Sequence, residues 1–272
     1  MRSKSSRYHV QSHRQPDHYF IFRGEAEGGG GGFAAAKAGN LFAQMVQSAS
    51  AQLIAADSTP ANCARVMRWL DQAVHGVSSE LVRATQGGAL SSALTTTMQS
   101  LLRLGDQLIY ACVGPSSAFL FRHGQAYRLG PSRTGPPAPS ESSCLGTMAT
   151  PSVHTRLVDI QRGDVFVLCS PGVVPEGDAE RALHVCLHST TAEETAAELI
   201  RAARRRGETE SASALIVRAP DAPEAAVNAS PPPSVPHAER RPASTIAPVA
   251  VSPVSAAPTL SPHQRVDPAR IA

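Results

Sequence analysis

The stretch Gly163-Asp164-Val165-Phe166-Val167-Leu168-Cys169-Ser170-Pro171-Gly172 is the most informative part of the chain. A glycine-aspartate turn leads into five apolar residues, which is the pattern of a buried strand. A second stretch has the same form, because the apolar run 107–113 ends in Gly114-Pro115-Ser116-Ser117. Both strands therefore end in a turn that contains proline, which has neither a carboxylate nor a backbone N–H.

The segments around these strands predict a mixed fold. Short apolar runs predict strands at 19–22, 89–98, 107–113, 118–122, 153–160, 165–169 and 214–217. Periodic apolar residues predict helices at 33–56, 61–83 and 191–206, and 131–143 is typical of a loop. Thr191 is expected to cap the last helix with Glu194 as its capping-box partner. Because strands and helices segregate along the chain, we predict an α+β sandwich of antiparallel sheets.

The C-terminal part of the chain differs in composition from the rest. Proline, alanine and serine dominate from about Ala219 onward, and the segment has no aromatic residue. Such a segment cannot bury enough apolar surface to offset its conformational entropy. We therefore predict one domain at 1–218 and a disordered Pro/Ala/Ser-rich tail at 219–272.

Charge and cysteine content limit the possible partners. The formal net charge is only +3, and no aromatic residues accompany the arginine cluster Arg204-Arg205-Arg206, so nucleic acid is not an expected ligand. The five cysteines are irregularly spaced, and the chain has no signal-peptide pattern and no apolar run near the roughly 18 residues that span a bilayer. These features favour a reducing, cytoplasmic location with no membrane partner.

The order of elements and turns from Arg7 to Arg218 resembles the metal-dependent protein phosphatases, the PPM or type 2C serine/threonine family. The likeness rests on Phe20-Ile21-Phe22-Arg23-Gly24 with the glycines after it, on 88–94, on 114–117, on 163–172 and on 206–213. The resemblance implies a four-layer αββα sandwich, in which two central sheets are flanked by helix pairs. It also implies a site with two metal ions, which activate a water for attack on a phosphomonoester.

The acidic residues of that site are mostly replaced in this chain. The resemblance maps them onto Asp17, Arg23, Pro115, Pro171 and Glu210. Only Asp17 and Glu210 keep a carboxylate, whereas Arg23 stands at the position of the metal-bridging aspartate and would repel a cation. A pair of divalent ions needs several oxygen ligands at nearly fixed distances. We therefore expect no cofactor and an inactive pseudophosphatase that binds a protein, phosphorylated or not.

An active enzyme is the alternative. A divergent serine/threonine phosphatase could use Mg²⁺ or Mn²⁺ in a one-metal or relocated site built from Asp17, Glu25, Glu27 and Glu210. In the inactive case, Arg23 and Gly24 could hold a phosphate without cleaving it, beside the start of the helix that follows the glycine tract 28–32.

Two weaker hypotheses come from other segments. His184-Val185-Cys186-Leu187-His188 alternates so that a strand would place its three possible ligands on one face, which is a weak hint of zinc. A peripheral strand or helix edge is the simpler interpretation. The proline-rich tail could dock on a partner that binds polyproline helices, although Pro231-Pro232-Pro233 lacks a well-placed basic anchor.

Overall fold

The computed structural model describes residues 8–14, 17–24, 30–54, 57–86, 94–115, 117–131, 144–175, 177–189, 191–208 and 212–219. The predicted tail lies outside these residues, except for Ala219. Within the described residues, no helix is both long and apolar enough to cross a bilayer.

The described residues form strands and helices in the order expected of an α+β fold. The strands are β1 Tyr8–Arg14, β2 Asp17–Gly24, β3 Thr96–Leu104, β4 Gln107–Val113, β5 Ser117–Arg122, β6 Gln125–Arg128, β7 His154–Asp159, β8 Val165–Cys169 and β9 Ala214–Arg218. The helices are α1 Gly30–Ser48, α2 Ser50–Ile54, α3 Pro60–Gln86, α4 Ala179–His188 and α5 Ala192–Arg205.

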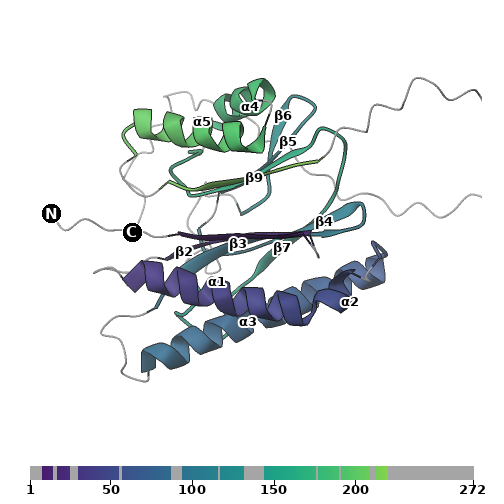
Figure 1. Ribbon diagram of the computed structural model, residues 1–272, viewed down its shortest axis with the longest axis vertical. Helices are drawn as coiled ribbons and strands as arrows, with labels where there is room; N and C mark the ends of the chain where they lie inside the picture. Colours follow the sequence, from purple (N-terminus) through teal and green to yellow (C-terminus); the bar gives the residue numbers. More distant parts are fainter. Residues whose placement is uncertain are drawn as a thin grey trace, which may run out of the picture.

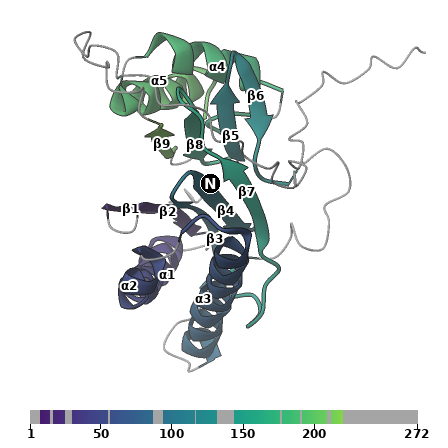
Figure 2. The ribbon, with the colours of Figure 1, turned by 90° about the vertical axis from the view of Figure 1, so that its right-hand side faces the viewer.

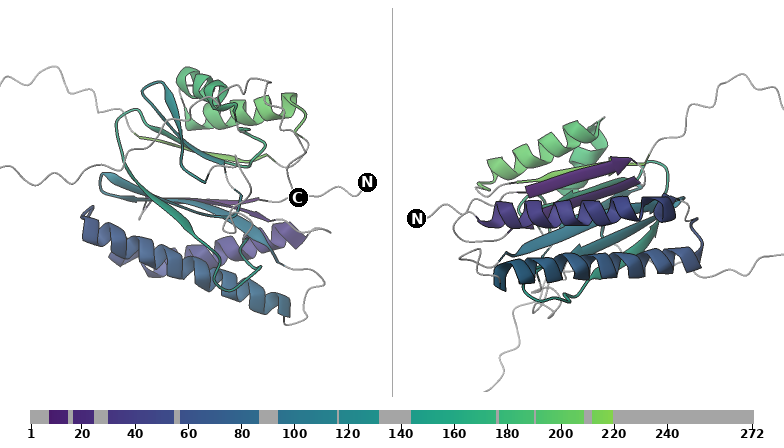
Figure 3. Two further views of the ribbon diagram at one scale, coloured as in Figure 1. Left: turned by 180° about the vertical axis from the view of Figure 1, so that it is seen from behind. Right: turned by 60° about the horizontal axis from the view of Figure 1, so that its bottom comes forward.

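The strands form two antiparallel sheets. The first sheet has five strands in the order β1-β2-β3-β4-β7, and the second has four in the order β6-β5-β8-β9. Figure 1 shows the sheets packed face to face, with α1, α2 and α3 beyond the first sheet and α4 and α5 beyond the second. Figure 2 shows the same four layers from the side. In Figure 3, α1 and α3 lie side by side across the first sheet.

Three apolar layers hold this arrangement together. One lies between the first sheet and α1 and α3, one between the sheets, and one between the second sheet and the helices α4 and α5. Representative members, in that order, are Phe42, Tyr110 and Phe119. Burial of these layers supplies most of the driving force for folding. The predicted four-layer sandwich is therefore confirmed.

Three strands differ from their predictions. A strand was predicted at 89–98, but β3 begins at Thr96 and continues to Leu104, and residues 87–93 are outside the described part. β3 carries Thr97, Gln99 and Ser100 in buried positions, and these polar residues obscured the apolar pattern. β1 and β6 were not predicted, because neither contains a continuous apolar run.

The segment around His184 is a helix, so of the two alternatives left open the helix is confirmed and the strand is wrong. In α4, His184 and His188 lie four residues apart on one exposed face, whereas Cys186 is buried on the other. The three residues therefore do not share a face, and the zinc ligand set that the alternation suggested does not form. By contrast, Thr191 and Glu194 form the expected capping box at the start of α5.

Candidate functional site

Several predicted site residues lie at one end of the sandwich, where β2, β4 and β8 end and β5 begins. In the second sheet Ser117 at the start of β5 pairs with Cys169 at the end of β8. Pro115 and Pro171 therefore both lie just beyond the same end of this sheet. In the first sheet Thr96 pairs with Gly24. We call this end, with Arg23, Gly24, Pro115 and Pro171, the candidate site.

A side chain of the first sheet connects the two sheets at the candidate site. Gln99 is 5 % exposed, and its Nε2 donates a hydrogen bond of 3.0 Å to the carbonyl oxygen of Cys169. Its Oε1 is buried and accepts no hydrogen bond within the described part of the chain. A buried acceptor without a donor is costly, so this oxygen is a polar group that a ligand could satisfy.

Arg23 points toward the second sheet at this end. Phe22 packs on the helix side of the first sheet and Ile21 on the side between the sheets, so alternation along β2 places Arg23 on the same face as Ile21. Its strand partner is Thr97, two residues from Gln99. A partly buried guanidinium therefore lies at the position that the resemblance gives to the metal-bridging aspartate.

Gly24 lies directly against the first turn of α1. A Cβ built on Gly24 would be 1.6 Å from the carbonyl oxygen of Gly31, a separation that backbone atoms cannot tolerate. Glycine is therefore required here for close approach between β2 and α1. The helix itself begins at Gly30, within the glycine tract 28–32 and three residues before the start predicted at residue 33.

The turn that contains Pro171 is held by hydrogen bonds. The backbone N–H of Ser170 donates to the carbonyl of Ser213 at 2.9 Å, and the N–H of Ser213 donates to Oγ of Ser170 at 3.2 Å. Nη2 of Arg206 donates to the carbonyl of Val173 at 2.8 Å, and its Nη1 lies 3.4 Å from a carboxylate oxygen of Asp178. Arg206 thereby fixes the backbone that follows Pro171.

A carboxylate that the sequence analysis did not select lies at this turn. A Cβ built on Gly172 would be 1.6 Å from Oε2 of Glu208, so the Glu208 side chain rests on the residue after Pro171. Neither Arg206 nor Glu208 was selected from the sequence. Their signal is position alone, since they flank Gly207, which has a φ of 86° at the end of α5.

Asp17 does not belong to the candidate site. It begins β2, whereas Arg23 and Gly24 end it, and an eight-residue strand spans about 23 Å. The carboxylate of Asp17 is instead 3.4 Å from Nη1 of Arg103. The expectation that Asp17 shares a site with Arg23 is therefore wrong, because the hairpin places them at opposite ends. Glu210, Glu25 and Glu27 lie outside the described residues.

The described side chains do not fit a pair of divalent cations. The positions that should supply bridging and terminal carboxylates carry Arg23, Pro115 and Pro171, and a guanidinium repels a cation while proline offers no side-chain ligand. Across the described residues, no group of three or more His, Cys, Asp or Glu side chains is arranged to hold a metal ion. The Glu208 carboxylate alone cannot replace them.

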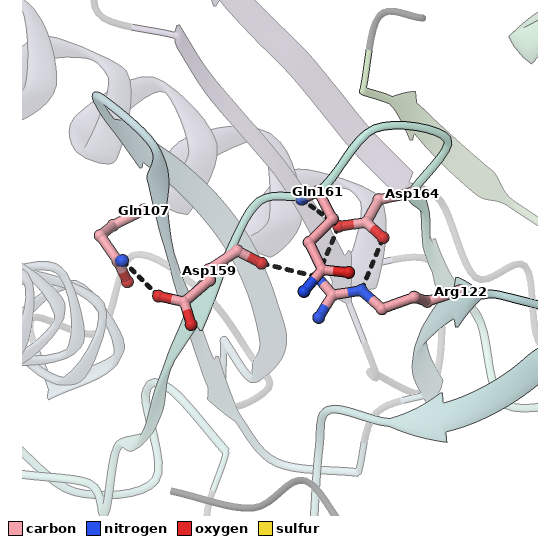
Figure 4. Close-up of polar contacts among 5 residues, drawn as sticks. All are labelled: Gln107, Arg122, Asp159, Gln161 and Asp164. Carbon is pink, nitrogen blue, oxygen red and sulfur yellow. Dashed lines mark hydrogen bonds and ion pairs between the residues drawn. The ribbon is translucent and has the colours of Figure 1, made fainter. Parts of the chain in front are cut away.

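The opposite end of the sandwich contains a buried polar network (Figure 4). Asp164 is fully buried and lies between Arg122 and the backbone N–H of Gln161, which donates to its Oδ2 at 2.8 Å. Nη2 of Arg122 also donates to the carbonyl of Asp159 at 2.6 Å, and Gln107 hydrogen-bonds the Asp159 carboxylate. Hydrogen bonds to Asp164 raise the pKa of the Arg122 guanidinium. Both carboxylate oxygens of Asp164 accept hydrogen bonds from protein donors, so this network is structural.

Comparison with solved structures identifies the fold. PppA, a key regulatory component of T6SS in Pseudomonas aeruginosa, matches with a TM-score of 0.61 at 18% identity over 79% of this chain and 97% of that chain. The serine/threonine phosphatase of S. agalactiae matches with a TM-score of 0.61 at 15% identity over 80% of this chain and 96% of that one.

A third structure contains metal. The catalytic domain of the serine/threonine protein phosphatase PstP in complex with two manganese ions matches with a TM-score of 0.58 at 22% identity, over 79% of this chain and 92% of that chain. No protein-family model and no curated protein matches this chain. The chain therefore has the fold of the metal-dependent serine/threonine phosphatases, as the resemblance implied.

Proposed function

We propose that this protein is a pseudophosphatase, a binding module with a phosphatase fold that recognises a protein without hydrolysing phosphate. The observation that carries this proposal is the exchange of carboxylates for Arg23, Pro115 and Pro171 at one end of the sandwich. Metal-assisted hydrolysis needs a bound ion to activate water, and these side chains offer no such ligand. A fold by itself does not specify an activity, so the site residues decide the function.

The charge of the candidate site favours an anionic group on the partner. A guanidinium presents several N–H donors in one plane and forms two-point hydrogen bonds with phosphate or carboxylate. Arg23 is partly exposed and stands between the sheets, beside the buried and unsatisfied Oε1 of Gln99. A phosphorylated side chain that also offers a hydrogen-bond donor would match both groups, which supports a phosphoprotein as the ligand.

A regulatory role in the cytoplasm is part of the proposal. One protein of the same fold, PppA, is described as a key regulatory component of T6SS, which supports regulation as a role open to this fold. Cys63, Cys169 and Cys186 are buried free thiols, which supports a reducing compartment. We also propose that residues 219–272 act as a tether or docking segment for the same partner.

The first experiment measures hydrolysis and metal binding. The full chain is incubated with p-nitrophenyl phosphate and Mn²⁺ or Mg²⁺, and metal binding is measured by isothermal titration calorimetry. We expect no turnover above a metal-free blank and no heat at millimolar metal. Metal-dependent turnover that disappears in Glu208→Ala or Glu210→Ala would overturn the proposal in favour of a divergent phosphatase.

The second experiment tests recognition by Arg23. Binding of a phosphoserine peptide library is compared for the wild type, Arg23→Glu and Arg162→Glu, since Arg162 is an exposed arginine in the turn before β8. Loss of binding in Arg23→Glu alone is the expected result. An equal loss of binding in Arg23→Glu and Arg162→Glu would show that net charge, and not the candidate site, retains the peptides. Binding at the wild-type level by Arg23→Glu would exclude Arg23 as the recognition residue.

A further inference from the structure

Two histidines form a close pair on the outer surface of the second helix layer. His184 and His188 are four residues apart in α4, both are exposed, and their ring centroids are 3.9 Å apart. One helical turn separates them, so both imidazoles project from the same face. The opposite face of α4 is anchored in the core by Ala182 and Cys186. The backbone that carries the pair is therefore fixed by packing.

Side chains of α5 complete the surroundings of this pair. His184 and His188 line a groove together with Glu193, Glu194 and Glu198. Glu194 is engaged in the capping box with Thr191, and Glu198 contacts Arg201 and Arg205. Glu193 is exposed, but among the described residues no third metal-binding side chain is arranged with the two imidazoles, so the histidine pair is the ligand set.

We propose that His184 and His188 form a two-point chelating site for a borderline divalent cation such as Zn²⁺, Ni²⁺ or Cu²⁺. Imidazole nitrogen is a preferred ligand for these ions, whereas Mg²⁺ and Mn²⁺ prefer oxygen. Two histidines at i and i+4 on one helix are a known arrangement for binding zinc. With two protein ligands, the remaining coordination positions are open to water or to a partner's side chain.

This site is separate from the candidate site described above. It lies on helix α4, on the solvent side of the second sheet, and it does not include Cys186. That thiol is buried in the core between α4 and the second sheet, on the face of α4 opposite the two histidines. An ion bound here would bridge two successive turns of α4, and would stabilise the native state by binding it selectively.

The test uses the untagged full chain and the metals alone. Zn²⁺ is titrated in competition with a chromogenic zinc indicator, and the wild type is expected to bind one ion. His184→Gln and His188→Gln should each weaken zinc binding by more than about tenfold. Substitution of residues that only support metal ligands already lowers metal affinity by about this factor. Glutamine suits an exposed helical position, and circular dichroism checks that each variant is folded.

The control is His123→Asn, which removes an exposed histidine in the turn between β5 and β6, where φ is 50° and asparagine is tolerated. It should bind zinc like the wild type. Undiminished zinc binding in the His184→Gln/His188→Gln double variant, or no zinc binding by the wild type, overturns the proposal. Because Mn²⁺ and Mg²⁺ should not compete here, this result is independent of any phosphatase-type metal binding.

Discussion

Arg122 and Asp164 form a two-point ion pair at the end of the sandwich opposite the candidate site. Nε of Arg122 donates to Oδ1 of Asp164 at 2.7 Å, and Nη2 donates to Oδ2 at 2.6 Å. The side chain of Asp164 is 0% exposed and that of Arg122 is 15% exposed. This pair joins β5 to the turn before β8, and so fixes the strand whose far end carries Pro171.

Removal of one partner should be strongly destabilising. Asp164→Asn leaves the Arg122 guanidinium without its counter-charge, and breaking a buried pair in this way costs about 3–5 kcal/mol of unfolding free energy. Urea denaturation measures the loss. The matched control is Asp17→Asn, which breaks the exposed pair with Arg103 and should cost less than about 1 kcal/mol. Equal losses in both variants would contradict a special role for the buried pair.

Two glycines of the candidate site should respond differently to alanine. Gly24→Ala places a methyl group on the backbone of Gly31, which cannot move without shifting α1, and should cost about 1–3 kcal/mol as overpacking does. Gly172→Ala meets only the end of the Glu208 side chain, which can rotate away. Thermal unfolding should therefore show a clearly smaller loss for Gly172→Ala, and the reverse order would contradict this packing.

His154 should make stability depend on pH. Burial lowers the pKa of His154 below 6.5, although a hydrogen bond to the Leu129 carbonyl opposes the shift. The unfolded chain therefore binds this proton at a higher pH than the folded chain. The contribution of neutral His154 to the unfolding free energy is therefore complete above pH 6.5. It is lost as the pH falls from there through the folded pKa, by at most about 1.4 kcal/mol per pH unit.

The measurement compares the urea unfolding free energy at pH 7.5 and pH 5.5 for the wild type and His154→Gln. The difference between the two pH values should be smaller in the variant. His123→Asn is the control, because that histidine is exposed. If the unfolding free energy depends on pH to the same extent in all three proteins, the dependence comes from groups other than His154.

The cysteines should differ in reactivity. Burial raises the pKa of Cys169 to about 12, and that of Cys186 to about 12, so neither thiol should react with iodoacetamide in the native protein at pH 8. Cys144 is partly exposed and should be labelled first. Mass spectrometry of native and urea-unfolded samples identifies the sites. Early labelling of Cys169 in the native protein would show that β8, which ends at Cys169, unfolds locally at a low cost in free energy.

Local patterns in the sequence predicted most of the fold. The run from Gly163 to Cys169 has five adjacent apolar residues and became β8, and Thr191 with Glu194 gave the start of α5. Such signals depend on neighbours along the chain, so they can be recognised without tertiary structure. For the segment 184–188 the sequence left a strand and a helix edge open, because its alternation of residue types also fits a strand, and packing against the second sheet selected the helix.

The sequence alone determined that prolines follow two buried strands and that arginine follows a third. These side chains do not bind metal ions, whatever their positions in the fold. Only the tertiary structure decided which side chains meet. It separated Asp17 from Arg23 by the length of β2, brought Glu208 onto Gly172, and paired the imidazoles of His184 and His188. The physical reason is that residue chemistry is fixed by covalent structure, whereas contacts between distant residues depend on strand register and on the layer in which each helix packs.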